Sequence, residues 1–327
     1  MKSLATFATL AALLLTGSVR AGELELVKTI ELKGKAGGLD HVALDAKRDR
    51  LFLANKSNNT LDIIDLKTGK LHDQKKQQTA IQGVCYAPDI DKVFVALGTG
   101  GLCNVFEGET YKLLKTISLK DDADNIRYNP ATHLVYVAHA EKSLAAIDGK
   151  SYALKADIKL PDTGEGFELE TKRPRLYLNA PAANAVVVID TDKNEVLKTY
   201  PTKLATGGVP LALDESAQRI YVGCRKDPKV LVMDTETGKE LSTADIVGGV
   251  DDLWVDAKRK RLFASCGDGA MVILKVTDAD HVEVAEKIES PKGTKTCLYV
   301  PETGRLYLAV PRQEGKEGPE IRIYQVK

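Results

Sequence analysis

The chain of 327 residues lacks an excess of either charge, with 46 Lys and Arg against 46 Asp and Glu. A balanced chain offers no clustered basic surface of the kind that displaces counterions, so a nucleic-acid partner is not expected. After residue 21 no apolar run approaches the roughly 20 residues that span a bilayer, so membrane insertion is not expected either.

Cysteine and catalytic motifs are equally sparse. The five cysteines are widely spaced, with no CxxC and no CxxCH, which argues against zinc ribbons, thioredoxin-type redox motifs and covalent haem. The simplest interpretation is that they are small apolar residues inside strands. HExxH and GxSxG are also absent, which excludes the zinc peptidases and serine hydrolases that carry them.

Residues 1–21 have a separate character. They combine a basic start at Lys2, an apolar run through Leu15 and small residues at Val19 and Ala21, the layout of a secretory signal peptide. We expect cleavage after Ala21 and a periplasmic or secreted protein. Residues 22–327 then form the folded part, which we expect to be one domain.

A unit of about 42 residues recurs seven times in this part. Each unit carries a short strand pattern such as RLFLAN, KVFVAL or RLYLNA, beginning at positions 50, 92, 134, 175, 219, 261 and 305. The spacings are 42, 42, 41, 44, 42 and 44 residues. Seven units at nearly one period predict a repeat architecture.

Every unit has the same internal order of four strands. An apolar strand such as HVALD precedes the recurring strand, and a third strand such as TLDIID and a more polar fourth strand follow. Alternation at period two with short turns predicts antiparallel pairing and almost no helix. Four-stranded units of this length predict an all-β, seven-bladed β-propeller.

The last unit ends after its third strand, EIRIYQVK. The segment LELVKTIEL near the start resembles the fourth strand LLKTISL of another unit. We therefore expect the N-terminal strand to complete blade seven and to cover an edge that would otherwise promote aggregation.

The stretches LFLANKSNNTLDIIDLKTGKL and LYLNAPAANAVVVIDTDKNEV resemble the YVTN-type repeat of the YncE-like bacterial exported seven-bladed propellers. The resemblance covers all seven units, from about residue 24 to the end, although the letters YVTN never occur intact. It implies the propeller fold. The family has no catalytic signature that can be carried over residue by residue.

The inner strands align into columns. Two apolar columns of the same parity should pack between blades: Val42, Val84, Ile126, Phe167, Leu211, Leu253 and Cys297, and Leu44, Tyr86, Tyr128, Leu169, Leu213, Val255 and Tyr299. The two positions before them should ring one mouth of the channel: Asp40, Gln82, Asp124, Glu165, Val209, Asp251 and Lys295, followed by His41, Gly83, Asn125, Gly166, Pro210, Asp252 and Thr296.

This carboxylate-rich mouth is the candidate site. Oxygen ligands around a ring axis suit a hard cation such as calcium, with Asp40, Asn125 and Asp252 as candidate ligands. Such a metal could also activate water, and lactonases of the propeller fold hold a metal at the channel mouth. The alternative is that these acidic residues only cap turns.

Two further residues point to the channel wall. Arg127 and Glu168 occupy equivalent positions on neighbouring inner strands, which predicts an ion pair between blades three and four. The alternative is an anion site built around Arg127. Trp254 falls in the same column and either fills space between blades six and seven or stacks on a ligand.

The leading hypothesis is an exported, non-catalytic propeller that binds a ligand at the channel mouth. The residues expected to contact it are Asp40, His41, Asp124, Asn125, Arg127, Glu168, Asp251 and Asp252. The ligand is a small molecule or a protein, and the propeller is expected to be a monomer. The rival hypotheses are a metal-dependent hydrolase of the lactonase kind and a structural interaction platform.

Overall fold

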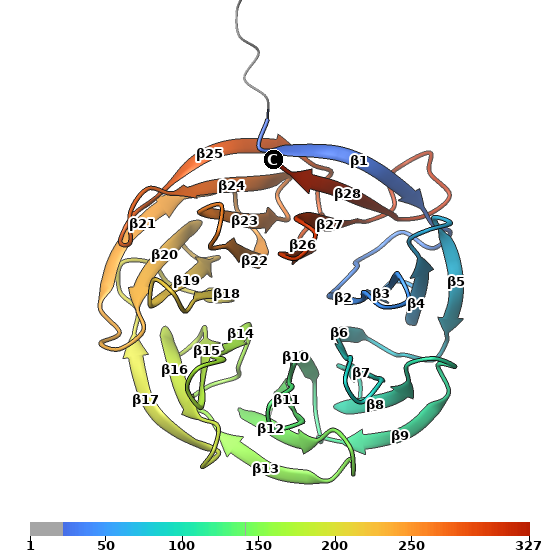
Figure 1. The fold of residues 1–327 in the computed structure, drawn as a ribbon, viewed down its shortest axis with the longest axis horizontal. Helices are drawn as coiled ribbons and strands as arrows, with labels where there is room; N and C mark the ends of the chain where they lie inside the picture. The colour runs from blue at the N-terminus through green and yellow to red at the C-terminus, as the bar shows by residue number, and fades with distance from the viewer. Residues whose placement is uncertain (1–21, 141) are drawn as a thin grey trace, which may run out of the picture.

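Seven four-stranded antiparallel sheets stand around a central channel (Figure 1). The computed structural model describes residues 22–140 and 142–327, and the expected signal peptide lies outside them. Every one of the 28 elements in these ranges is a strand, as the period-two pattern predicts. The described residues include no helix long and apolar enough to cross a membrane.

Each blade runs from an inner strand at the channel to an outer strand at the rim. Blades one and two comprise β2 (Val42–Asp45), β3 (Arg50–Asn55), β4 (Thr60–Asp65), β5 (Lys70–Lys75), and β6 (Ile81–Ala87), β7 (Lys92–Leu97), β8 (Leu102–Glu107), β9 (Leu113–Ser118). Blades three and four comprise β10 (Ala123–Asn129), β11 (Leu134–His139), β12 (Ser143–Asp148), β13 (Leu154–Lys159), and β14 (Phe167–Leu169), β15 (Arg175–Ala180), β16 (Ala185–Asp190), β17 (Glu195–Pro201).

The remaining blades follow the same order. Blades five and six comprise β18 (Gly208–Asp214), β19 (Arg219–Cys224), β20 (Lys229–Asp234), β21 (Glu240–Asp245), and β22 (Val250–Asp256), β23 (Arg261–Cys266), β24 (Ala270–Val276), β25 (Val282–Glu289). Blade seven comprises β26 (Thr296–Val300), β27 (Arg305–Val310), β28 (Glu320–Val326) and the N-terminal β1 (Leu24–Glu31).

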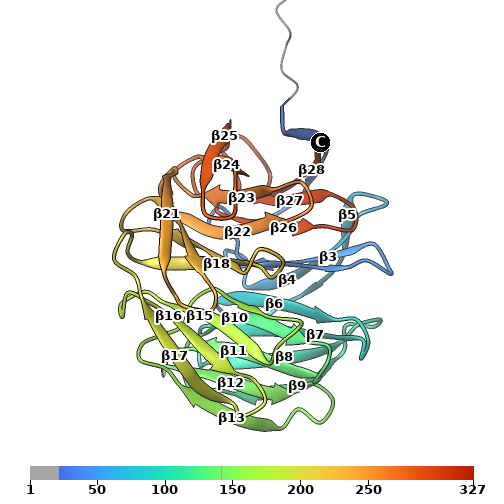
Figure 2. The same cartoon turned by 60° about the vertical axis from the view of Figure 1, so that its left-hand side comes forward.

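The predicted closure of the ring is confirmed. β1 pairs antiparallel with β28, from Leu24 opposite Val326 to Glu31 opposite Glu320. Glu23 also accepts hydrogen bonds from the Arg261 side chain of blade six, the shorter at 2.9 Å. The two ends of the described chain therefore share one blade (Figures 1 and 2).

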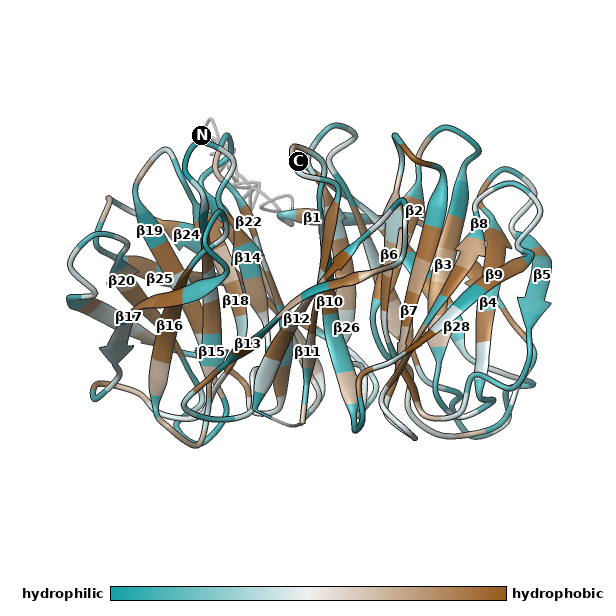
Figure 3. Ribbon diagram, turned by 90° about the horizontal axis from the view of Figure 1, so that it is seen from below, coloured by the Kyte–Doolittle hydropathy of each residue, from teal (hydrophilic) through white to brown (hydrophobic). Residues whose placement is uncertain are grey.

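The core lies between neighbouring blades. Seven apolar clusters occupy the seven junctions of the ring, and the apolar segments of the strands run between polar loops at both ends (Figure 3). An aromatic ring stands at the third position of every second strand, no more than 2% exposed: Phe52, Phe94, Tyr136, Tyr177, Tyr221, Phe263 and Tyr307. Truncating one such ring to alanine costs about 3–5 kcal/mol in typical cores.

The two apolar columns of the inner strands behave differently. The first column is buried in all seven blades, at most 7% exposed, as predicted. In the second column only Tyr299 is fully buried, but every member packs in or against one of the junction clusters, so the predicted packing between blades is confirmed with incomplete burial. The members lie towards the ends of the inner strands, where they also border cavities. Leu44, Tyr86 and Tyr299 border the cavity in the channel.

The acidic residues that end many strands have a local role. Asp148, Asp190 and Asp234 each accept hydrogen bonds from backbone N–H groups two and three residues further along the chain. These side chains fix the turns that follow them. The five cysteines are free thiols inside strands, and four of them are buried.

Candidate functional site

The mouth predicted from the columns exists as a cavity of about 180 Å³ where the inner strands begin. All seven residues of the first rim position line it, together with five others: Asp40, Gln82, Asp124, Glu165, Val209, Asp251 and Lys295, with His41, Lys56, Asn125, Gly166 and Arg225. We call this cavity the charged mouth. Asp252, also expected to contact a ligand at this rim, does not line the cavity and is buried beside His41.

Bulges in the inner strands aim these side chains. The pairing of β10 with β11 is interrupted at Asp124 and Asn125, and the pairing of β22 with β23 is interrupted at Asp251. A bulge inserts residues that the partner strand does not match, so it redirects their side chains. The same interruption occurs at the corresponding positions of β6 and β18.

Glycine at two rim positions lets neighbouring inner strands approach closely. A Cβ on Gly83 would lie 2.1 Å from the Asp124 carbonyl oxygen, and one on Gly166 would lie 2.6 Å from the Val209 oxygen. The Gly166 amide donates a 2.9 Å hydrogen bond to that same Val209 oxygen. The His41 amide likewise donates to the Gln82 oxygen of the next blade at 3.2 Å. The mouth is narrow because backbones meet there directly.

His41 is held between two carboxylates. Its Nδ1 lies 3.4 Å from Asp252 and its Nε2 lies 3.8 Å from Asp40. Burial of the ring favours the neutral form, but the charges of Asp252, Asp40 and Asp124 outweigh it and raise the pKa of His41 to about 9. At neutral pH His41 is therefore a cation in the middle of the acidic residues.

The other acidic residues find cations from the protein itself. Asp251 forms ion pairs with both Arg225 and Lys295. Lys56 lies 3.7 Å from Asp40 and donates a 2.6 Å hydrogen bond to the Gln82 side chain. The charged mouth thus carries Lys56, Arg225, Lys295 and protonated His41 to balance its carboxylates.

Among the residues that the structure describes, two carboxyl groups of the mouth have no such ion-pair partner, and their pKa values lie near neutrality. Burial, with the charge of Asp40, raises the pKa of Asp124 to about 6. Burial, with the charge of Asp124, raises the pKa of Glu165 to about 7. Lowering the pH below 7 therefore adds protons to this end of the channel.

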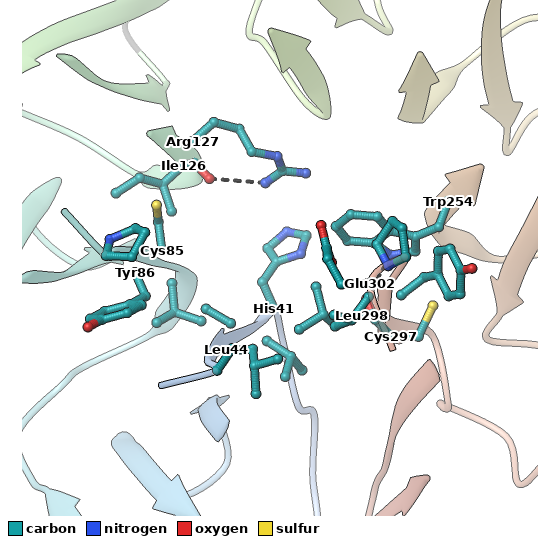
Figure 4. Close-up of a pocket in the computed structure, with 18 residues that line it drawn as sticks. His41, Leu44, Cys85, Tyr86, Ile126, Arg127, Trp254, Cys297, Leu298 and Glu302 are labelled. Atoms are coloured by element: carbon teal, nitrogen blue, oxygen red, sulfur yellow. Dashed lines mark hydrogen bonds between the residues drawn. The ribbon is translucent and has the colours of Figure 1, made fainter. Parts of the chain in front are cut away.

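A larger cavity occupies the channel on the other side of His41 (Figure 4). It has a volume of about 440 Å³, and we call it the channel cavity. Its wall is mainly apolar and aromatic, with contributions from Leu44, Tyr86, Trp254 and Leu298. The Trp254 ring is fixed by a 2.9 Å hydrogen bond from Nε1 to the Cys297 carbonyl oxygen. Trp254 therefore packs between blades six and seven and also faces the cavity.

The predicted ion pair between blades three and four is confirmed, and it lies in this channel. Arg127 Nε and Nη2 each lie 3.4 Å from the same oxygen of Glu168. Arg127 Nη1 donates to the backbone oxygen of Ile126 at 3.0 Å, as the dashed line in Figure 4 shows. Arg127 also lies over the Phe167 ring, 5.7 Å from its centre.

The chain is similar to known proteins in sequence and in fold. No protein-family model matches the chain. The uncharacterised protein YncE of Salmonella typhi is 26% identical over 197 residues, 57% of this chain and 54% of that relative. YncE of Escherichia coli O157:H7 is 32% identical over 122 residues, 34% of this chain and 33% of that relative. The chain spans about half the length, or less, of the curated relatives it matches.

Among solved structures, Kuenenia stuttgartiensis hydrazine synthase matches 85% of this chain and 94% of its own, with a TM-score of 0.74. The identity of 16% makes this a similarity of fold alone. The seven blades, the blade shared by the two ends of the described chain, and the sequence matches to YncE all lead to the same conclusion. The chain is a seven-bladed β-propeller that is similar to YncE. Its matched YncE relatives are uncharacterised, so its function has to be argued from its own cavities.

Two of the three candidate metal ligands of this propeller, Asp40 and Asp252, contact other groups of the protein. Among the described residues, no three His, Cys, Asp or Glu side chains are arranged to share an ion. Asp40 faces His41 and Lys56. Asp252 faces His41 and accepts a 2.8 Å hydrogen bond from the Cys297 amide. These two carboxylates are therefore already paired with cations or hydrogen-bond donors of the protein.

Sequence reasoning missed two cations of the mouth. Lys56 and Arg225 each follow directly after a second strand, RLFLAN and RIYVGC. Those strands run antiparallel to the inner strands, so their ends point to the mouth where the inner strands begin. The residue after each second strand could therefore have been placed at the mouth from the sequence, by the same alignment of strands that placed the acidic rim there.

Proposed function

We propose that this propeller is a non-catalytic binding protein that takes a small molecule into the channel cavity. The observation that carries the proposal is a cavity of about 440 Å³ with a mainly apolar wall and few charged groups. That volume lies within the roughly 300–1,000 Å³ typical of small-molecule sites, which are largely apolar with a few polar groups. We therefore place the ligand site in the channel cavity behind the mouth, and not at the mouth itself, where the alignment of the inner strands predicted the site.

The charged mouth is proposed to close one end of this site. Ion pairs and hydrogen bonds engage its side chains, and its volume of about 180 Å³ is small. A ligand then enters from the opposite end, past Pro88, Pro301 and Glu302, which line the channel cavity. Monomeric state and export to the periplasm or beyond remain parts of this proposal.

Filling the cavity tests the proposal. Ala43 is 8% exposed and lines the channel cavity, so Ala43→Phe places a ring in the ligand's space. The purified protein is screened for thermal stabilisation by a library of small molecules. We expect some compounds to raise the melting temperature of the wild type and to lose this effect in Ala43→Phe.

The matched control is Ala279→Phe, which adds the same ring at an exposed turn of blade six. This variant should respond to the compounds as the wild type does. If Ala43→Phe folds and keeps every response, the ligand does not occupy the channel and the proposal is wrong. If no compound stabilises the wild type, the small-molecule proposal also fails, and a protein-binding platform is the better hypothesis.

A further inference from the structure

Arg127 belongs to two cavities at once. Besides the channel cavity, a second cavity of about 460 Å³ lies between blades three and four, and we call it the lateral cavity. Arg127 lines both cavities, and its partner Glu168 lines the lateral one. Arg127 therefore borders open space on two sides.

The shape of blade four explains the lateral cavity. Its inner strand β14 ends at Leu169, one residue before the position that corresponds to the end of the neighbouring β10 at Asn129. After β14 the chain bends through Thr171–Pro174, and these residues line the cavity instead of continuing the sheet. This turn therefore borders the open space beside Arg127 and Glu168.

The Arg127–Glu168 pair is loose. Both of its contacts are 3.4 Å long, compared with about 2.7–2.9 Å for a well-formed charge-assisted hydrogen bond. Both side chains are about a quarter exposed, at 23% and 25%. Burial raises the pKa of Glu168 in spite of the adjacent Arg127 charge, so the carboxylate is a poorly stabilised counterion.

Arg127 also has N–H donors that are not used by Glu168 or by the Ile126 oxygen. A guanidinium carries about five N–H donors in a planar fork. Nε and Nη2 each use one donor on Glu168, and Nη1 uses one on the Ile126 oxygen. Among the described residues, one N–H on each of Nη1 and Nη2 has no partner. Two adjacent N–H groups of this kind match the two oxygens of a carboxylate.

The rest of the channel cavity suits an apolar body attached to such a group. Trp254 lies across the channel from Arg127, and Tyr86 and Leu44 contribute further apolar wall (Figure 4). Flat rings gain from contact with aromatic side chains beyond the area they bury. The geometry therefore combines one loosely paired cation with an apolar, partly aromatic chamber.

We propose that Arg127 anchors the carboxylate of a small aromatic acid, whose ring lies in the channel cavity against Trp254. This proposal rests on the proposed function and adds the chemical class of the ligand. The carboxylate takes the free Nη1 and Nη2 donors, and Glu168 moves aside or remains as a weak third partner. The lateral cavity provides the room for that movement.

Three probes with one ring system and different charges test the class. They are 1-naphthoate, the neutral 1-naphthylmethanol and the cationic 1-naphthylmethylammonium, titrated by calorimetry at pH 8. Trp254 is the only tryptophan, so a change in its fluorescence places a bound probe in the channel. We expect 1-naphthoate to bind at least about tenfold more tightly than the other two probes, since hydrogen bonds to charged groups contribute more than neutral ones.

Variants then assign the anchor. Arg127→Met should weaken 1-naphthoate at least about tenfold and leave 1-naphthylmethanol within about twofold. Glu168→Gln removes the competing charge and should tighten 1-naphthoate several-fold. Arg312→Met, at an exposed arginine, is the control and should bind all three probes as the wild type does.

Each other outcome overturns the proposal. Equal affinity for the neutral probe, tighter binding of the cation, or binding of 1-naphthoate that survives Arg127→Met would each remove Arg127 as a carboxylate anchor. Failure of all three probes would reject the aromatic-acid class. The library screen with Ala43→Phe decides separately whether any small molecule uses the channel, so the two failures can be told apart.

Discussion

At the scale of single residues, one protonated histidine holds the charged mouth together. His41 lies between Asp252 and Asp40, and its positive charge compensates carboxylates that come from three different blades. In the sequence His41 is simply one polar residue in a rim column. Its role depends on Asp124 and Asp252, which lie 83 and 211 residues further along the chain.

The first prediction concerns this histidine and pH. Its pKa rises from 6.5 to about 9 on folding, so its stabilisation is complete below about pH 6.5 and is lost as the pH rises through 9. We expect the free energy of unfolding of the wild type to fall between pH 7 and pH 9.5, with His41 contributing at most about 3 kcal/mol of that fall. Urea denaturation at the two pH values measures it.

His41→Gln should remove this part of the pH dependence, because glutamine does not titrate. The exposed His281 provides the matched control, and His281→Gln should keep the slope of the wild type. Equal slopes in wild type and His41→Gln would mean that the mouth does not hold a histidine cation.

At the scale of elements, the N-terminal strand decides whether the ring is closed. β1 supplies the outer edge of blade seven, and its Ile30 is 1% exposed in the cluster that joins blades seven and one. Without β1, the backbone of β28 would lose its partner along this edge. An unpaired strand edge is a template for association with another chain.

The second prediction follows from this edge. Deleting residues 22–34 should lower the melting temperature sharply and cause concentration-dependent association. Calorimetry and light scattering measure the two effects. Leu26→Lys, at a position of β1 that is 51% exposed, is the control and should melt as the wild type does. A truncated protein that melts normally and stays monomeric would contradict the closing role of β1.

At the scale of the whole molecule, the ring brings charges of both signs to one end of the channel. Lys56, Arg225 and Lys295 come from blades one, five and seven, and together with His41 they line the mouth beside its carboxylates. The prediction of a divalent metal at Asp40, Asn125 and Asp252 assumed uncompensated carboxylates. The structure supplies the compensation from within the protein.

The third prediction is that divalent ions do not stabilise the propeller. Thermal melts with calcium, magnesium, manganese or zinc should match melts in chelator to within about 1 °C, because ligands stabilise only by binding the folded state. Elemental analysis should find no stoichiometric metal. A stoichiometric ion whose stabilisation disappears in Asp40→Ala with Asp252→Ala would restore the metal-site hypothesis and with it the hydrolase.

The architecture can be derived from the amino-acid sequence alone. The 42-residue period set the seven blades, alternation set the strands, and the three-stranded last unit with LELVKTIEL set the shared blade. Parity along the inner strands also located the charged mouth and the Arg127–Glu168 pair. These features follow from local patterns that repeat, so they can be read without knowing any distance.

Only the tertiary structure decided what these residues do. Which acidic residue meets which cation depends on bulges and on close backbone contact at Gly83 and Gly166. The channel cavity depends on how far the inner strands of blades one, two, three, six and seven stand apart, which makes Leu44, Tyr86 and Tyr299 of the second apolar column part of its wall. Such volumes arise from packing across blades, and no segment of the sequence encodes them alone.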